Sequence, residues 1–256
     1  METRTFLEIC NDVAIQLRFD PIQSVSGNTD KNAVFVSLAV RQGLRRDVFW
    51  AHPWAILRRE GGVAYQTNLA HYLLPSDFDH ILNDTAWDAI RKLPAIGPLD
   101  PFEWEILKRS GDGPKVDAVA FTIAGPPAVS FGTVGPTSYR SYIHIDPVPT
   151  AKSSGPGMTY AYISEEIVVS SAGVRKNDFT ADSDVPVLDA SLVEHAGYVR
   201  GLRMLGLGFA DEMRELQAAI KVVARRDGGR ARMSASGGRG KILLSNTPGY
   251  GRARRR

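Results

Sequence analysis

The sequence predicts an α+β protein that is mainly a helical bundle, with a small inserted β-rich module and an extended C-terminal arm. Apolar residues recur at helical spacing near both ends of the chain, which predicts four helices, two from each half. Between them, short strand-like runs are separated by Gly, Pro and Ser, a pattern typical of strands and turns. The predicted divisions are 1–49 (N-terminal helices), 50–182 (β-rich module with one short helix), 183–227 (C-terminal helices) and 228–256 (basic arm).

Two helices are predicted before residue 50. The apolar face of the first is formed by Phe6, Ile9, Val13 and Leu17. Pro21 ends this helix, because proline cannot continue one. The second follows a polar turn in which Thr29 or Asp30 is available as the N-cap, and it reaches about Asp47. Its apolar residues are Ala33, Val36, Val40 and Leu44.

Two further helices are predicted after residue 183. The first has an apolar stripe formed by Leu188, Leu192, Ala196, Val199 and Leu202. The second follows Gly206-Leu207-Gly208 and has a stripe formed by Phe209, Met213, Leu216, Ile220 and Val223. Since each of the four helices has one apolar and one polar face, the economical arrangement is a bundle that joins both halves of the chain.

The middle of the chain is predicted to be β-rich. A hairpin is expected with its turn at Gly61-Gly62, followed by short strands in 72–90, where DFDHIL is an alternative single helical turn. Asp100, Pro101 and Glu103 form a capping-box pattern that predicts a helix over 101–110. The later runs VDAVAFTIAG, YIHIDPVP and MTYAYISEEIVVSS alternate with turn formers and are expected to be strands.

Charge is distributed unevenly along the chain. The last 29 residues, from Gly228, hold eight Lys or Arg and no acid, so the net +3 of the whole chain leaves −5 for residues 1–227. A basic tail suits either nucleic acid, through phosphate neutralisation, or an acidic protein surface. Composition does not choose between these two partners.

Composition, cysteine count and the lack of long apolar segments limit the class of protein to which the chain can belong. Hydrophobic residues make up 43% of 256, enough to bury a sizeable core. The single cysteine, Cys10, excludes an intramolecular disulfide and is expected to be a small buried hydrophobe. The N-terminus lacks the apolar run of a signal peptide, and no later segment is long and apolar enough for a membrane span. We therefore expect synthesis in the cytoplasm and no membrane partner.

Signatures of catalysis are missing from the sequence, which predicts a non-enzymatic protein with no cofactor and no metal. No GxSxG elbow occurs. Gly240-Lys241 lacks the first glycine and the Ser or Thr of a phosphate loop, and Glu165-Glu166, adjacent on a strand, should point to opposite faces. The histidines, none at metal-ligand spacing and each expected to be structural, are His52, His71, His80, His144 and His195.

Two clusters of possible metal ligands each have a structural and a functional interpretation. The densest set of possible metal ligands is His71, Asp77, Asp79 and His80. It surrounds a proline turn without a recognised metal spacing, so a metal is not expected there. Asp182-Ser183-Asp184 resembles the start of a calcium loop but lacks its Gly and distal Glu. Helix capping is the better interpretation of these aspartates.

Four segments, taken in order, resemble podovirus head-to-tail adaptor proteins. They are LPSDFDHILNDTAWDAI, GPLDPFEWEILKRS, TYAYISEEIV and DFTADSDVPVLDASLVEHAGYVRGLRMLGLGFAD. The resemblance covers about residues 4–227 and depends on the order of these short segments, while the Arg-rich end departs from the family pattern. It implies a structural virion protein of the neck or tail, with a helical bundle, an embedded β-domain and a C-terminal arm.

The resemblance also implies partners. Adaptors of this family form a twelve-subunit ring that binds the portal protein and the tail nozzle, and tail fibres are a further expected contact. Genomic DNA would pass through the lumen without sequence-specific binding, and the acidic balance of residues 1–227 suits such a conduit because a negative wall repels phosphates.

The expected portal-docking arm has a short apolar strand in KILLS, which could add to an exposed sheet edge on a partner. Its candidate contact residues are Ile242, Leu243, Leu244, Tyr250, Arg252 and Arg254. The alternative for the apolar three is a disordered tail with an incidental patch. The rival function is DNA binding through the tail, for which the sequence supplies Arg252, Arg254, Arg255 and Arg256.

Tryptophans are the expected anchors of a subunit contact, because aromatic residues carry much of the binding energy at interfaces. The chain has Trp50, Trp54, Trp87 and Trp104. The ring hypothesis predicts that some of them lie at subunit contacts. The alternative is that all four pack inside the subunit.

Overall fold

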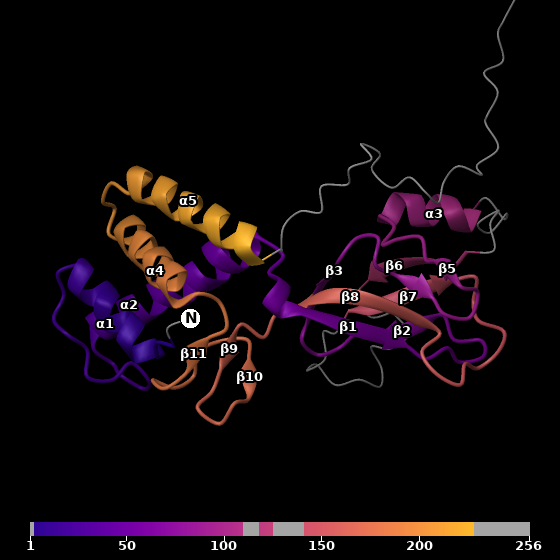
Figure 1. Cartoon of the computed structure of the whole chain (residues 1–256), viewed down its shortest axis with the longest axis horizontal. Coiled ribbons are helices and arrows are strands. Elements are labelled where there is room, and N and C mark those ends of the chain that lie inside the picture. The colour runs from indigo at the N-terminus through magenta and orange to yellow at the C-terminus, as the bar shows by residue number, and fades with distance from the viewer. Residues whose placement is uncertain (1–2, 110–117, 125–140, 228–256) are drawn as a thin grey trace, which may run out of the picture.

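The structure, a computed structural model, describes residues 3–109, 118–124 and 141–227. Figure 1 shows two lobes side by side along the long axis. The helical lobe contains α1 (Phe6–Gln16), α2 (Lys31–Gln42), α4 (Ala190–Met204) and α5 (Ala210–Asp227). The β lobe contains most of the strands, with α3 (Pro101–Arg109) packed on them. Each lobe has its own cluster of buried apolar side chains.

The expectation of a mainly helical bundle is wrong. The fold is mixed α+β, with about 38% of the described residues in helices and about 20% in strands of three antiparallel sheets. The physical reason lies in strand length. Five of the described strands have only two residues, too short to show an alternating pattern, whereas each helix of the bundle repeats its stripe over three or more turns.

The largest sheet is built around one strand, β8 (Met158–Ser164). It pairs antiparallel with β1 (Arg58–Val63), β3 (Phe78–Ile81) and β4 (Trp87–Asp88). β4 also pairs with β5 (Leu93–Pro94). DFDHIL therefore contains a strand and not a helical turn.

The expected turn at Gly61-Gly62 is also wrong. Both glycines lie inside β1, where Gly61 pairs with Tyr160 and Gly62 with Thr159. A Cβ atom at Gly61 would lie 2.5 Å from the ring of Tyr160. The glycine therefore allows an aromatic ring to cover the strand, a use that sequence does not distinguish from a turn.

Two smaller sheets complete the fold. In the β lobe, β7 (Tyr142–Asp146) lies between β2 (His71–Leu73) and β6 (Ala120–Ala124). The third sheet lies beside the helices in Figure 1 and consists of β9 (Val168–Val169), β10 (Arg175–Lys176) and β11 (Val185–Pro186). It joins the helical core through Val168 and Phe179, whose ring stacks on Phe6 with centroids 4.2 Å apart.

Aspartate side chains cap the N-termini of α2, α3 and α4. Asp100 accepts hydrogen bonds from the N–H groups of Phe102 and Glu103, both at 2.8 Å, which confirms the predicted capping box of α3. Asp30, and not Thr29, caps α2. The N-cap of α4 is Asp189, which accepts from the N–H of Ser191.

The side chains of Asp182 and Asp184 accept hydrogen bonds from residues outside the helices and do not cap a helix, so that expectation is wrong. Their backbone carbonyls accept from the first N–H groups of α1, at Phe6 and Leu7. Burial alone would raise the pKa of Asp184, but hydrogen bonds from Lys176 and from backbone N–H groups outweigh it and lower the pKa. These aspartates therefore tie α1 to the turn before α4.

Close helix packing in the bundle depends on glycines. α2 continues into a π-helical turn, η1 (Gly43–Val48), and a Cβ at Gly43 would lie 2.6 Å from the carbonyl carbon of Ala196 in α4. Gly197 and Gly201 of α4 give Val40 and Leu17 the same close approach. Among the described residues, no helix combines the length and apolar character needed to cross a membrane.

Candidate subunit interface

The predicted docking arm lies outside the described residues. This holds for Ile242, Leu243, Leu244, Tyr250, Arg252 and Arg254. The description ends at Asp227, the last residue of α5. The Asp227 carboxylate accepts a hydrogen bond from the N–H of Ala55 and lies 3.9 Å from Nε2 of His52. Asp227, the last described residue, therefore lies beside the segment that joins the two lobes.

The four tryptophans divide into two pairs. Trp54 and Trp104 are buried, with 2% and 7% of their surface exposed. Trp50 and Trp87 are 65% and 42% exposed. The alternative in which all four pack internally is therefore excluded. That Trp50 or Trp87 lies at a subunit contact stays a prediction.

Trp50 lies in a short segment that Trp54 anchors to the helical core. It lies in the short helix η2 (Phe49–Ala51), which is followed by η3 (Ala55–Leu57). Trp54 fills the core beneath, its indole N–H donates to the carbonyl of Val48 at 2.9 Å, and its ring contacts that of His52. These contacts of Trp54 anchor the backbone of the segment to the helical core, and the exposed indole of Trp50 extends from this backbone.

Two hollows flank Trp50. One, of about 320 Å³, lies between η2 and α5 and is lined by Met213, Leu216 and Ile220 among others. The other, of about 510 Å³, lies between η2 and β3 and includes Pro53, Ile81 and Leu82. We call Trp50 with these two hollows the Trp50 surface. An exposed indole between two partly apolar hollows is a shape that a complementary protein surface can fill.

Two histidines form a pair that sequence does not reveal. His71 of β2 and His144 of β7 are paired across the sheet, with ring centroids 4.1 Å apart. Nδ1 of His71 and Nε2 of His144 are buried without a hydrogen-bond partner. Burial, reinforced by His71 and Lys108, lowers the pKa of His144 to about 4. This arrangement keeps His144 neutral near pH 7.

The densest predicted ligand set is divided between structural contacts. His71 contacts His144, whereas the Nδ1 of His80 lies 2.6 Å from a carboxylate oxygen of Asp79. Asp77 accepts a hydrogen bond from the hydroxyl of Tyr162 at 3.0 Å. The set is therefore not brought together around one point.

The other candidate reactive groups are also engaged. Glu165 and Glu166 face different cations, Arg45 and Arg59, each at 3.6 Å. Burial raises the pKa of Glu165. Cys10 is buried, as predicted, and desolvation raises the pKa of its thiol to about 12, so thiolate is disfavoured there.

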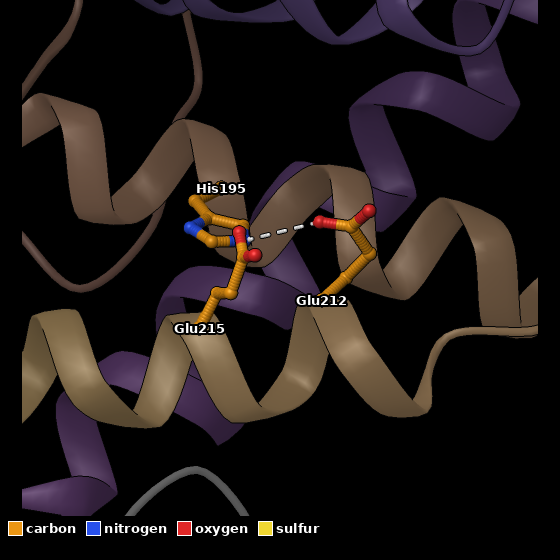
Figure 2. A group of neighbouring side chains, drawn as sticks. All are labelled: His195, Glu212 and Glu215. Carbon is orange, nitrogen blue, oxygen red and sulfur yellow. Dashed lines mark ion pairs between the residues drawn. The ribbon is translucent and has the colours of Figure 1, made fainter.

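One convergent group was missed by the sequence analysis. His195 of α4 lies beside Glu212 and Glu215 of α5, as Figure 2 shows. The spacing of the two glutamates places them on one helix face, but only the α4–α5 contact brings the histidine to them. No protein-family model matches the chain, and no curated protein matches it.

Proposed function

We propose that the protein is a structural virion component of a short-tailed phage, a head-to-tail adaptor whose subunits form a ring between the portal and the tail nozzle. The ordered resemblance of its segments to podovirus adaptors suggests this class and a ring of twelve. The observation that carries the proposal is the Trp50 surface, because an exposed indole between two hollows suits a subunit contact. The ring would enclose a channel for the genomic DNA.

Energetics support Trp50 as the anchor of a neighbouring subunit. Tryptophan is enriched among the interface residues whose truncation costs about 2 kcal/mol or more. The contacts of Trp54 beneath the segment reduce the ordering that binding would otherwise require, and this lowers the entropic cost of association. Met213, Leu216 and Ile220 supply apolar walls beside it.

The start of the basic segment supports a second contact, to the portal. Asp227, the last described residue, contacts Ala55 and lies near His52, and His52 lines one hollow of the Trp50 surface. The KILLS strand with Ile242, Leu243 and Leu244 would add to an exposed sheet edge of the portal. Arg252 and Arg254, further along the arm, would meet acidic groups there.

The experiment compares association of four chains with the portal ring from the same virion, followed by light scattering and native mass spectrometry. The full-length chain should form a stoichiometric ring on the portal. Trp50→Ala should weaken ring formation by about tenfold or more, and a chain ending at Asp227 should lose portal binding. Phe102→Ala, which removes an aromatic side chain that is 74% exposed on α3, is the matched control and should assemble normally. Equal assembly of the Trp50 and Phe102 variants would contradict the proposed interface.

A second candidate is a structural protein that binds DNA through its tail, favoured by the eight Lys or Arg in 228–256. Phosphate neutralisation predicts that the DNA affinity falls steeply with salt, with a slope that grows with each cation engaged. If the chain ignores the portal but binds DNA with such a slope, and the chain ending at Asp227 does not, this candidate replaces the adaptor.

A further inference from the structure

Three ligand-type side chains converge between the last two helices. Figure 2 shows His195 projecting from α4 toward Glu212 and Glu215 on α5. One ligand atom from each residue lies within 4.8 Å of the other two, and Nε2 of His195 is 3.9 Å from Oε2 of Glu212. His195 and Glu212 are partly buried and Glu215 is exposed, so the group borders solvent.

The local fold positions this group firmly. α4 ends in a Schellman motif, in which the N–H of Leu207 donates to the carbonyl of Leu202 and Gly206 takes a positive φ of 71°. This turn folds α5 back along α4. Glu212 and Glu215, three residues apart on α5, then lie on one helix face toward His195.

The charges of the group are not balanced by the protein. Among the described residues, the Glu215 carboxylate has no ion pair or hydrogen bond, and the partner of the Glu212 carboxylate is the imidazole of His195. Neighbouring acids differ, since Glu194 contacts Arg4 and Asp211 pairs with Arg214. Two carboxylates held close without a cation repel each other. A bound divalent ion would remove this repulsion.

We propose that His195, Glu212 and Glu215 bind a zinc ion, with solvent completing the coordination. One imidazole nitrogen and two carboxylate oxygens are ligands that zinc accepts. At zinc–ligand bonds of about 2.0–2.2 Å, tetrahedral ligand atoms stand about 3.3–3.6 Å apart, so side-chain rotations of partly exposed glutamates suffice to close the site. Magnesium and calcium, which favour oxygen ligands in larger number, fit less well.

The ion would fasten α5 to α4. Within α5 the buried residues are Leu216 and Ile220, and Met213, Ala219, Val223 and Ala224 pack partly buried against the same core. A metal bound near its first turns adds a link at the end where α5 leaves the α4 turn. The inference is independent of the adaptor assignment, because zinc binding is measured on the chain itself.

The test measures zinc content after dialysis, the melting temperature in zinc or magnesium, and the visible spectrum with cobalt(II) as a zinc substitute. The wild-type chain should retain a single zinc per chain, and its melting temperature should rise with the logarithm of free zinc but not with magnesium. His195→Asn and Glu215→Gln should each abolish stoichiometric zinc and the cobalt spectrum. Asp211→Asn, an adjacent acid outside the group, should change neither.

Two results would overturn the proposal. One is a wild-type chain that retains no zinc at micromolar free metal. The other is zinc that persists in His195→Asn but disappears in His144→Phe, which would place the ion at the histidine pair of the β lobe. Circular dichroism of each variant, compared with that of the wild type, separates a lost ligand from a lost fold.

Discussion

At the scale of single residues, the most demanding interaction in the helical lobe is a buried ion pair. Arg200 of α4 donates two hydrogen bonds of 2.7 Å, from Nε and an Nη atom, to the two carboxylate oxygens of Asp47 in η1. Their side chains are 11% and 13% exposed. A desolvated pair of this kind costs free energy to bury, and it is tolerated when both partners are present.

We predict that Arg200→Met lowers the free energy of unfolding by about 3–5 kcal/mol, because it leaves the Asp47 carboxylate buried without its partner. Urea denaturation measures this change. Arg214→Met removes a cation from an exposed pair with Asp211 and should cost less than about 1 kcal/mol. The double variant Asp47→Leu with Arg200→Met should recover part of the loss, and a double variant no better than Arg200→Met would argue against an uncompensated charge as the cause.

The histidine pair predicts a pH dependence of stability. The pKa of His144 is lowered to about 4 in the fold, mainly by burial and then by His71 and Lys108, against an ordinary value of 6.5. Well above pH 6.5 the imidazole is neutral in both the folded and the unfolded chain, so it makes no contribution to the pH dependence of stability. Between pH 6.5 and 4 the unfolded chain takes up a proton that the folded chain refuses, so stability falls as the pH falls.

The measurement is the urea midpoint of wild type and His144→Phe from pH 7 to pH 4. The wild-type midpoint should fall more than that of the variant over this window, because phenylalanine keeps a ring in place and removes the titration. Carboxylates elsewhere titrate equally in both proteins and cancel in the difference. Parallel pH curves would show that His144 does not carry the effect.

Sequence anticipated individual residues where the pattern was local. The burial of Cys10 follows from its position on the apolar stripe of a helix. The difference between Trp50 and Trp54 does not, because they are the same residue type four positions apart and only the packing of Trp54 under Val48 decides which is exposed. His195 likewise needed the α4–α5 turn before its carboxylate neighbours became visible.

At the scale of elements, glycines decide how closely the helices pack. Gly43 meets the backbone of Ala196 and Gly197, whereas Gly201 meets the side-chain tip of Leu17. Backbone atoms of a packed helix cannot move aside, but a leucine tip can rotate. The two sites should therefore respond differently to the same added methyl group.

We predict that Gly43→Ala destabilises the protein by about 1–3 kcal/mol, although alanine is favoured over glycine in helices by about 1 kcal/mol. Gly201→Ala should cost less, since Leu17 can adjust. Gly208→Ala, where an added Cβ has no neighbour within 4 Å, is the control and should stay within about 0.5 kcal/mol of wild type. Thermal denaturation ranks the three, and a stable Gly43→Ala would mean that η1 can shift away from α4.

The elements that sequence predicted well are those with long periodic patterns or local caps. The four bundle helices and the capped α3 belong to this group. The errors have another cause, because they concern features set by distant partners. Gly61 lies in a strand under the ring of Tyr160, which is distant in sequence. Asp184 accepts a hydrogen bond from the first N–H of α1 through its backbone carbonyl, and its side chain does not cap a helix.

At the scale of the whole molecule, the two cores are joined by the central strand β8. Met158 and Tyr162 belong to the β-lobe core, and Ile163, one residue further, belongs to the helical core. Adjacent strand residues face opposite sides. Near its C-terminal end, one face of β8 therefore packs in the β-lobe core and the other packs in the helical core. Local unfolding should therefore follow the lobes, with β8 as the element that couples them.

We predict that Phe121→Ala, in β6, raises hydrogen exchange in β2, β6 and β7 while α1 and α4 stay protected. Phe6→Ala, the matched change in the helical core, should do the reverse, because each ring is fully buried in its own cluster and its loss costs about 3–5 kcal/mol locally. Ile163→Ala should raise exchange in both lobes. If Phe121→Ala exposes α4 as much as β6, the two lobes unfold as one cooperative unit.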